Sequence, residues 1–152
     1  MGTVLNSCDI EIRFPNLKDT HYEITSTPTY KYNCLAWAAG VNNKIWDYVS
    51  LHKNIVYWPR TAQKNYRLET IRKIFYDLGY FEEARNDLFE CDYEKVAIYS
   101  IDHVYYTHVA RQEKTGYWTS KLGKDHDIEH TLSGLEGIEY GKVVLVLKRK
   151  SC

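Results

Sequence analysis

The sequence predicts an α+β domain in which helices come first and an antiparallel sheet follows. Two segments of the first half have helical character: an apolar, alanine-rich run from Cys34 to Gly40, and residues 66–78, where apolar side chains recur every three or four positions. The second half contains short runs of β-branched and aromatic residues, which are typical of strands. This order of elements indicates helices packed on an antiparallel sheet.

The length predicts a single domain over residues 1–152. A chain of 152 residues and 17.9 kDa is long enough to bury a core of its own. We expect an irregular N-terminal segment over residues 1–30, a helical part over 31–80 and the sheet over 95–150. Pro15 and Pro28 interrupt regular structure in the first of these parts.

Local signals define the ends of both helices. Asn33 stands at the N-cap of the first helix, so Cys34 falls in its first turn, and Gly40 ends it. In the second helix, Gly79 follows the last apolar residue. The apolar face of that helix consists of Leu68, Ile71, Ile74, Phe75 and Leu78.

Four strands are expected in the second half, over residues 95–100, 104–112, 116–122 and 142–148. Residues 125–140 are polar and read as a connection, with a short helix near 131–135. If the second and third strands form a hairpin around residues 113–115, opposite residues sum to about 228. His108 then faces Ser120, and Ala110 faces Trp118.

Composition excludes several classes of function. Lys and Arg number 20, as do Asp and Glu, so the formal net charge is zero and a general nucleic-acid binder is not expected. No apolar run approaches a membrane span, and the N-terminus lacks the pattern of a signal peptide. We therefore expect a cytoplasmic protein, or one exported without a signal peptide.

The cysteines and glycines predict neither metal nor cofactor. Cys8, Cys34, Cys91 and Cys152 form no CxxC pair, and the histidines form no HExxH motif. The glycines are scattered, without a phosphate-binding loop. Free thiols and no bound metal or nucleotide are the expectation.

Cys34 is the first candidate for chemistry. A thiol is a good nucleophile only as the thiolate, which the N-terminus of a helix favours through its free N–H groups. The alternative is a small buried side chain in an apolar helix, because free cysteine is among the most buried residue types.

His108 and Ser120 extend this candidate to a triad. His108 lies on a strand, where it would serve as the base for Cys34, and Ser120 on the next strand would orient the imidazole. Asp127 is the alternative third residue. Each of these side chains also has a purely structural interpretation, as a core histidine or a solvated strand residue.

Further side chains are candidates for the pocket. Asn33 and Tyr32 precede the nucleophile and are candidates for the oxyanion hole, while Trp37 and Trp118 are candidates for the wall of a substrate cleft. Arg111 and Lys121 read more simply as solvated charges at strand ends than as binders of an anion.

The order of these motifs resembles the papain-like cysteine hydrolases and their small bacterial relatives of the NlpC type. Asn33 to Ala38 (N-C-L-A-W-A) resembles the helix that carries the nucleophile, and Thr107 to Ala110 (T-H-V-A) resembles the histidine strand. The resemblance implies a papain-like fold, with a Cys-bearing helix and a second helix packed on a four- to five-stranded antiparallel sheet. It further implies Cys34 as nucleophile, His108 as base and Ser120 in the third position.

One position departs from this pattern. Papain-type enzymes place a glutamine six residues before the cysteine for the oxyanion hole, and this chain has Pro28 there. The backbone N–H of Cys34 and a neighbour would have to replace it. A wider pattern that includes Y-N-C-L-A-W-A-A-G, T-H-V-A-R-Q and W-T-S-K-L-G resembles a group of small, mostly bacterial proteins, which implies no substrate.

Three hypotheses follow. The first is a cysteine hydrolase or transferase that acts on an amide or ester bond of a peptide, a protein or another amide-bearing substrate. The second is a non-catalytic protein-binding module on the same fold, such as an immunity or partner-recognition protein, for which 14 tyrosines provide suitable side chains. The third is an unrelated α+β fold with a buried Cys34. The sequence leaves substrate and oligomeric state open.

Overall fold

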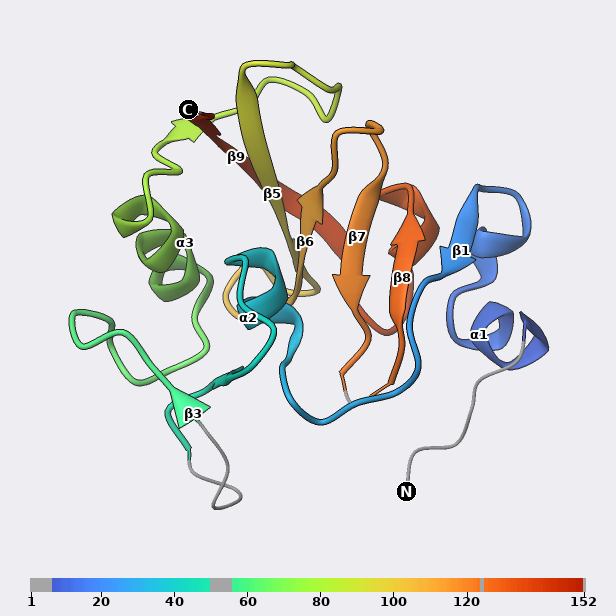
Figure 1. Cartoon of the computed structure of the whole chain (residues 1–152), viewed down its shortest axis with the longest axis horizontal. Helices are drawn as coiled ribbons and strands as arrows, with labels where there is room; N and C mark the ends of the chain where they lie inside the picture. The colour runs from blue at the N-terminus through green and yellow to red at the C-terminus, as the bar shows by residue number, and fades with distance from the viewer. Residues whose placement is uncertain (1–6, 50–55, 124, 152) are drawn as a thin grey trace.

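The fold is dominated by one seven-stranded sheet, with a separate two-stranded parallel sheet and a few short helices around it (Figure 1). The computed structural model describes residues 7–49, 56–123 and 125–151. The strand order of the large sheet is β1-β8-β7-β6-β5-β9-β4, and every neighbouring pair in it is antiparallel. The small sheet pairs β2 with β3.

The elements of the large sheet occupy the second half of the chain, apart from its edge strand β1. Its strands are β1 (Tyr22–Ile24), β4 (Glu82–Glu83), β5 (Tyr93–Ser100), β6 (Tyr106–Gln112), β7 (Trp118–Lys121), β8 (Asp127–His130) and β9 (Lys142–Lys150). The small sheet contains β2 (Ile45–Trp46) and β3 (Val56–Tyr57). The helices are α1 (Ser7–Arg13), η1 (Pro15–Lys18), α2 (Cys34–Ala38), α3 (Leu68–Asp77) and η2 (Ser133–Leu135).

The central strands are buried on both faces, which divides the core in two. Along β5, Val96 and Ile98 belong to one cluster of buried residues, while Ala97 and Tyr99 belong to the other. Successive side chains of a strand point to opposite faces, so the sheet itself separates the clusters. We name these faces by the helices that cover them.

The α2 face is covered by α2 and α3. Its buried residues include Leu35, Ala36, Ile71, Ile74, Phe75, Val96, Ile98, Val109 and Leu147. The α1 face is covered by α1, η1 and η2. Its buried residues include Ile10, Phe14, Leu17, Ala97, Tyr99, Ala110, Trp118, Ile128 and Leu135. In Figure 1, α2 lies at the lower end of β6 and to the left of β7, and α1 lies beyond β8, below β1.

The papain-like arrangement of two helices on four or five strands is wrong. The sheet has seven strands, because β1, β4 and β8 add to the four expected ones. The missed strand β8 has the polar sequence D-I-E-H, yet it is largely buried, since its polar groups find partners inside the fold. Tyr32 donates to Asp127, and Ser120 bonds to His130.

The hairpin register also differs from the expectation. Arg111 pairs with Thr119 and Gln112 with Trp118, so opposite residues of β6 and β7 sum to 230 rather than 228. The Glu113 N–H donates to the Tyr117 carbonyl and closes a loop over residues 114–116, in which Gly116 has φ 91°, so the turn lies one residue further along the chain than expected. A shift of two residues keeps every side chain on its expected face.

The two helices and four strands predicted from the sequence are present close to their expected positions. The Asn33 side chain accepts the N–H of Ala36 and caps α2 as predicted. The N-terminal segment is more regular than expected, because α1 and η1 place Ile10, Phe14 and Leu17 against the sheet.

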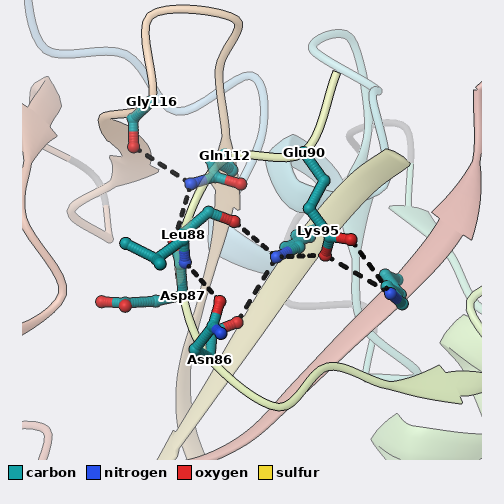
Figure 2. A network of polar contacts seen from close by, with 8 residues as sticks. Asn86, Asp87, Leu88, Glu90, Lys95, Gln112 and Gly116 are labelled. Atoms are coloured by element: carbon teal, nitrogen blue, oxygen red, sulfur yellow. Dashed lines mark hydrogen bonds and ion pairs between the residues drawn. The ribbon is translucent and has the colours of Figure 1, made fainter. Parts of the chain in front are cut away.

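A buried lysine ties the loop after β4 to the sheet (Figure 2). The side chain of Lys95 on β5 is fully buried, and its ammonium donates to the Leu88 carbonyl at 2.5 Å and to the Asn86 carbonyl at 3.4 Å. Its charge is paired with Glu90 at 2.8 Å, and Glu90 also contacts Lys148. These bonds hold a loop that exposes Leu88 and Phe89.

We expect Lys95→Met to release this loop, because methionine keeps the apolar stem and removes the donors. The free energy of unfolding should fall by about 1–3 kcal/mol, and amide exchange should accelerate over residues 86–92. Lys148→Met is the control, since its partly exposed ion pair with Glu90 should contribute less than about 1 kcal/mol. Unchanged exchange in Lys95→Met would contradict this role.

Gly141 is expected to be the least replaceable glycine. It has φ 75° in the turn before β9, and an added Cβ would clash with the backbone carbonyl of Ser100. Gly141→Ala should lower the free energy of unfolding by more than about 2 kcal/mol in denaturant titrations. Gly40→Ala has a similar φ of 86° but open space around the new methyl group, so it should cost only about 1 kcal/mol. Equal losses of stability in the two variants would show that the positive φ, and not the clash with Ser100, determines the cost.

Candidate functional site around Cys34

Cys34 opens α2 and lies where the pairing of β6 and β7 ends. The paired residues of these strands are Arg111 with Thr119 and Gln112 with Trp118. Because the N–H of Glu113 points to β7 across the hairpin, the N–H of Val109, four residues earlier, points the same way. This N–H and that of Leu35 meet the sulfur of Cys34.

The thiol is a partly buried, protonated group in this environment. Burial raises the pKa of Cys34, while the backbone N–H groups of Val109 and Leu35 and the charge of Lys121 oppose the rise. Cys34 therefore has the donors that stabilise a thiolate, but burial outweighs them. Cys91, the other cysteine whose side chain is described, is exposed.

Asn33 positions the start of α2 and is fully engaged in doing so. Its Oδ1 accepts the N–H of Ala36 and that of Trp46, each at 3.1 Å, and its Nδ2 donates to the Trp46 carbonyl at 2.9 Å. The side chain thus joins α2 to β2. These bonds use one of the two Nδ2 hydrogens, so the other could donate to an oxyanion.

Trp37 fixes the position of α2 over the sheet. Its Nε1 donates to Thr119 Oγ1 at 3.1 Å, and the guanidinium of Arg111 stacks 3.8 Å from its ring centroid. Arg111 also donates to the Trp37 carbonyl and pairs with Glu113. The expectation of a solvated Arg111 is therefore wrong: it is a helix-to-sheet contact. The Trp37 ring also stacks on Tyr32.

His108 lies on the α1 face, whereas its neighbour Val109 lies on the α2 face with Cys34. Its ring stacks on Tyr140 with centroids 4.1 Å apart and planes 7° apart, and it meets the edge of Tyr99. Burial, followed by the proximity of His130, lowers the pKa of His108 well below its usual range. Its Nε2 is buried and has no hydrogen-bond partner among the described residues.

Ser120 lies on the same face as His108, as predicted, but its partner is a different histidine. Its hydroxyl is 2.7 Å from Nε2 of His130, whose Nδ1 is 2.7 Å from the Thr131 carbonyl. That carbonyl can only accept, so Nδ1 carries the proton and the Ser120 hydroxyl donates to Nε2. His130 was read as part of a loop, because the polar strand β8 was missed.

Asp127 and Tyr32 form a buried pair on the α2 face. The Tyr32 hydroxyl donates to Asp127 Oδ2 at 2.6 Å, and burial followed by this bond raises the pKa of Tyr32. Asp127 Oδ1 is buried and has no partner among the described residues. Trp118, in contrast, packs in the core of the α1 face.

Lys121 faces Asp127 in the register of β7 and β8, and it is fully buried. Its Nζ donates to the carbonyls of Gly123 and Asp125 and lies 5.4 Å from the centroid of the Tyr32 ring. The expectation of a solvated Lys121 is wrong. No sequence pattern marks it, because its partners are backbone carbonyls of the turn that follows.

Cys34 and His108 are close although the sheet separates their side chains. The amide nitrogen of Val109 is about 2.4 Å from the Cα of His108. Because this amide meets the Cys34 sulfur, the sulfur lies within roughly 7 Å of that Cα. To reach the sulfur, the His108 ring would have to leave Tyr140 and come around from the α1 face.

No group of three or more His, Cys, Asp and Glu side chains within residues 7–49, 56–123 and 125–151 is arranged to hold a metal ion. The same parts of the chain contain no helix long and apolar enough to cross a bilayer. A groove of about 920 Å³ lies away from Cys34, between α1 and the turns at Ile101 and Ile138.

Fold and site together define a small sheet protein with a thiol at a helix start. Residues 23–148 match the family model described as a domain of unknown function, DUF7689, and the chain belongs to this family. Searches of curated proteins and of solved structures found no match. A relation to the NlpC-type hydrolases stays a prediction.

Acid should destabilise the fold through His108 and His130. Burial lowers the pKa of His130 to about 4 from 6.5, so the unfolded chain binds more protons than the folded one between these values. The contribution of neutral His130 to the free energy of unfolding is therefore fully present above pH 6.5 and is lost as the pH falls. For His130 alone, this loss should be about 2 kcal/mol between pH 7 and pH 5. His108 acts in the same direction.

Denaturant titrations at pH 7, 6 and 5 measure this loss. His130→Gln should lower stability at pH 7 but flatten its pH dependence. His103→Asn is the control, because His103 is exposed and asparagine tolerates its φ of 61°. A slope that is the same in wild type and His130→Gln would refute this assignment.

Proposed function

We propose that the protein is a cysteine hydrolase or acyl transferase that acts on an amide or ester bond, with Cys34 as its nucleophile. The position of Cys34 carries this proposal: it opens α2, and the backbone N–H groups of Val109 and Leu35 and the charge of Lys121 oppose the rise of its pKa. Such donors stabilise negative charge on the sulfur and, once it has attacked, on the neighbouring oxyanion.

The proposed reaction is acyl transfer through a thioester. The sulfur of Cys34 attacks the substrate carbonyl carbon, a carbon–sulfur bond forms, and the thiol proton passes to a base. The tetrahedral intermediate expels an amine or alcohol, which takes that proton. Water or another acceptor then attacks the thioester and frees Cys34.

His108 is the proposed base. Burial lowers the pKa of His108 well below its usual value, so its imidazole is neutral at physiological pH, and its Nε2 forms no bond among the described residues. The ring would leave the Tyr140 stack and turn toward β7 to reach the sulfur. Ser120, on the same face as His108, is the proposed orienting residue, and Asp127 on the α2 face is the alternative.

The free thiols of Cys34 and Cys91 support a reducing compartment, which we propose to be the cytoplasm. The substrate class is a peptide, protein or other amide.

A second candidate function, a non-catalytic protein-binding module, is favoured by a specific observation. The sheet separates the Cys34 side chain from those of His108 and Ser120, and burial keeps the thiol protonated. In this candidate the polar groups are structural, and exposed aromatic side chains such as Tyr30, Tyr105 and Tyr117 bind the partner.

Acylation by p-nitrophenyl acetate discriminates between the two candidates. We expect a burst of nitrophenolate from the wild type and a thioester on Cys34 in peptide mass spectra. Cys34→Ala should abolish both, and His108→Ala should slow acylation by about 10²–10⁴-fold, the usual contribution of a general base.

Cys91→Ala is the matched control, since it removes the exposed thiol and should leave the burst unchanged. The folded state of each variant is checked by circular dichroism. If Cys34 acylates no faster than Cys91, or if His108→Ala acylates like the wild type, the binding module is the better interpretation.

A further inference from the structure

We propose that Lys121 is the positioning residue of the Cys34 site: its buried ammonium, fixed by the turn after β7, holds the thiolate of Cys34 in the gap between β6 and β7. This inference rests on the proposed role of Cys34 as a nucleophile. It adds to that role a residue outside the predicted triad.

The backbone fixes the Lys121 ammonium. Its Nζ donates to the Gly123 carbonyl at 2.6 Å and to the Asp125 carbonyl at 2.7 Å. An ammonium has three N–H donors, and in the described part of the chain no residue accepts the third. Gly123 has φ 57°, which lets the turn curl back over the side chain.

The segment before α2 is packed onto the same end of β7 and β8. Tyr32 lies between Lys121 and Asp127: its hydroxyl bonds to Asp127, and its ring is 5.4 Å from the Lys121 ammonium. On the other side of Cys34, Trp37 bonds to Thr119, which shares its face with Lys121. The contacts of Tyr32 and Trp37, on either side of Cys34 in the sequence, therefore place Cys34 next to Lys121.

The charged and titratable groups around the sulfur come from three strands and three connecting segments. They are Lys121 on β7, Asp127 on β8, Asp125 in the turn between them, Tyr32 before α2, Tyr106 on β6 and Tyr140 before β9. The tyrosines are neutral, because burial raises the pKa of Tyr32, Tyr106 and Tyr140. Lys121 is thus the cation of this cluster, and the negative charges of Asp125 and Asp127 offset part of its attraction for the thiolate.

The placement explains why a charge is buried here. Burial lowers the pKa of Lys121, and the charges of Asp127, Asp125 and Cys34 oppose this change. The two carbonyls and the two aspartates already stabilise the ammonium before Cys34 ionises. A thiolate beside it would add a further anion at the moment when Cys34 loses its proton.

The test is the titration of Cys34 in protein labelled with ¹³C at the cysteine Cβ, whose chemical shift reports the thiolate without any reagent having to reach the sulfur. We expect Lys121→Met to lower the thiolate fraction of Cys34 about tenfold at a given pH. Lys121→Arg should restore most of it, and Cys91 is the internal control, because its exposed thiol should titrate identically in every variant.

Asp127→Asn separates charge from packing. This variant removes an anion beside Lys121 and also breaks the Tyr32–Asp127 pair. If Lys121 acts through its charge, the thiolate fraction of Cys34 should stay equal or rise. If Lys121 acts only through packing, the thiolate fraction should fall as it does in Lys121→Met. The proposal is overturned if Lys121→Met titrates like the wild type, or if Asp127→Asn lowers the thiolate fraction as much. Acylation by p-nitrophenyl acetate tests the proposed function separately, since a thiolate held by Lys121 can exist in a protein that does not acylate.

Discussion

The burial of β5 and β6 on both faces is the constraint on which the rest of the structure depends. A strand covered on both sides sends alternate residues into two separate cores. Val109 and His108 are neighbours in sequence, yet they belong to different cores, and the helix that carries Cys34 packs on only one of them. Asn33 and Trp37 hold α2 on one face of the sheet, and this face determines which side chains Cys34 can contact.

The same constraint explains the two buried lysines. Lys95 and Lys121 are on strands whose faces are covered, and both residues are buried, so hydrogen bonds and nearby anions must compensate each ammonium. Both lysines bond to backbone carbonyls of an adjacent loop, and both have a carboxylate nearby, Glu90 for Lys95 and Asp127 for Lys121. They differ in what lies beside them: an exposed loop in one case and a thiol in the other.

Local signals of the sequence predicted the elements better than their assembly. The cap at Asn33 and the apolar spacing of residues 68–78 are short-range features, and they define α2 and α3 correctly. The strand β8 was missed because its polar side chains are paired only through contacts distant in sequence, such as Tyr32 with Asp127. The number of strands could not follow from local patterns, since β1 and β4 are edge strands of three and two residues that exist only by pairing.

The candidate site shows the same limit more sharply. Alternation placed His108 and Ser120 on one face correctly, but nothing local indicates which face α2 covers or that His130 is the partner of Ser120. The buried environment of Lys121 was also invisible, because a lysine at the end of a strand is normally solvated. Long-range packing decides each of these points.

The arrangement of Cys34 and His108 is compatible with catalysis on energetic grounds, although their side chains lie on different faces. Breaking an aromatic stack such as that of His108 on Tyr140 costs about 0.5–1.5 kcal/mol beyond the area it buries. A general base contributes roughly 10²–10⁴-fold in rate, about 3–5 kcal/mol. The cost of moving the imidazole off Tyr140 is therefore smaller than the rate gain from a general base. This comparison assumes that bound substrate holds the ring in its rotated position. In a binding module no such gain exists, and His108 stays with Tyr140.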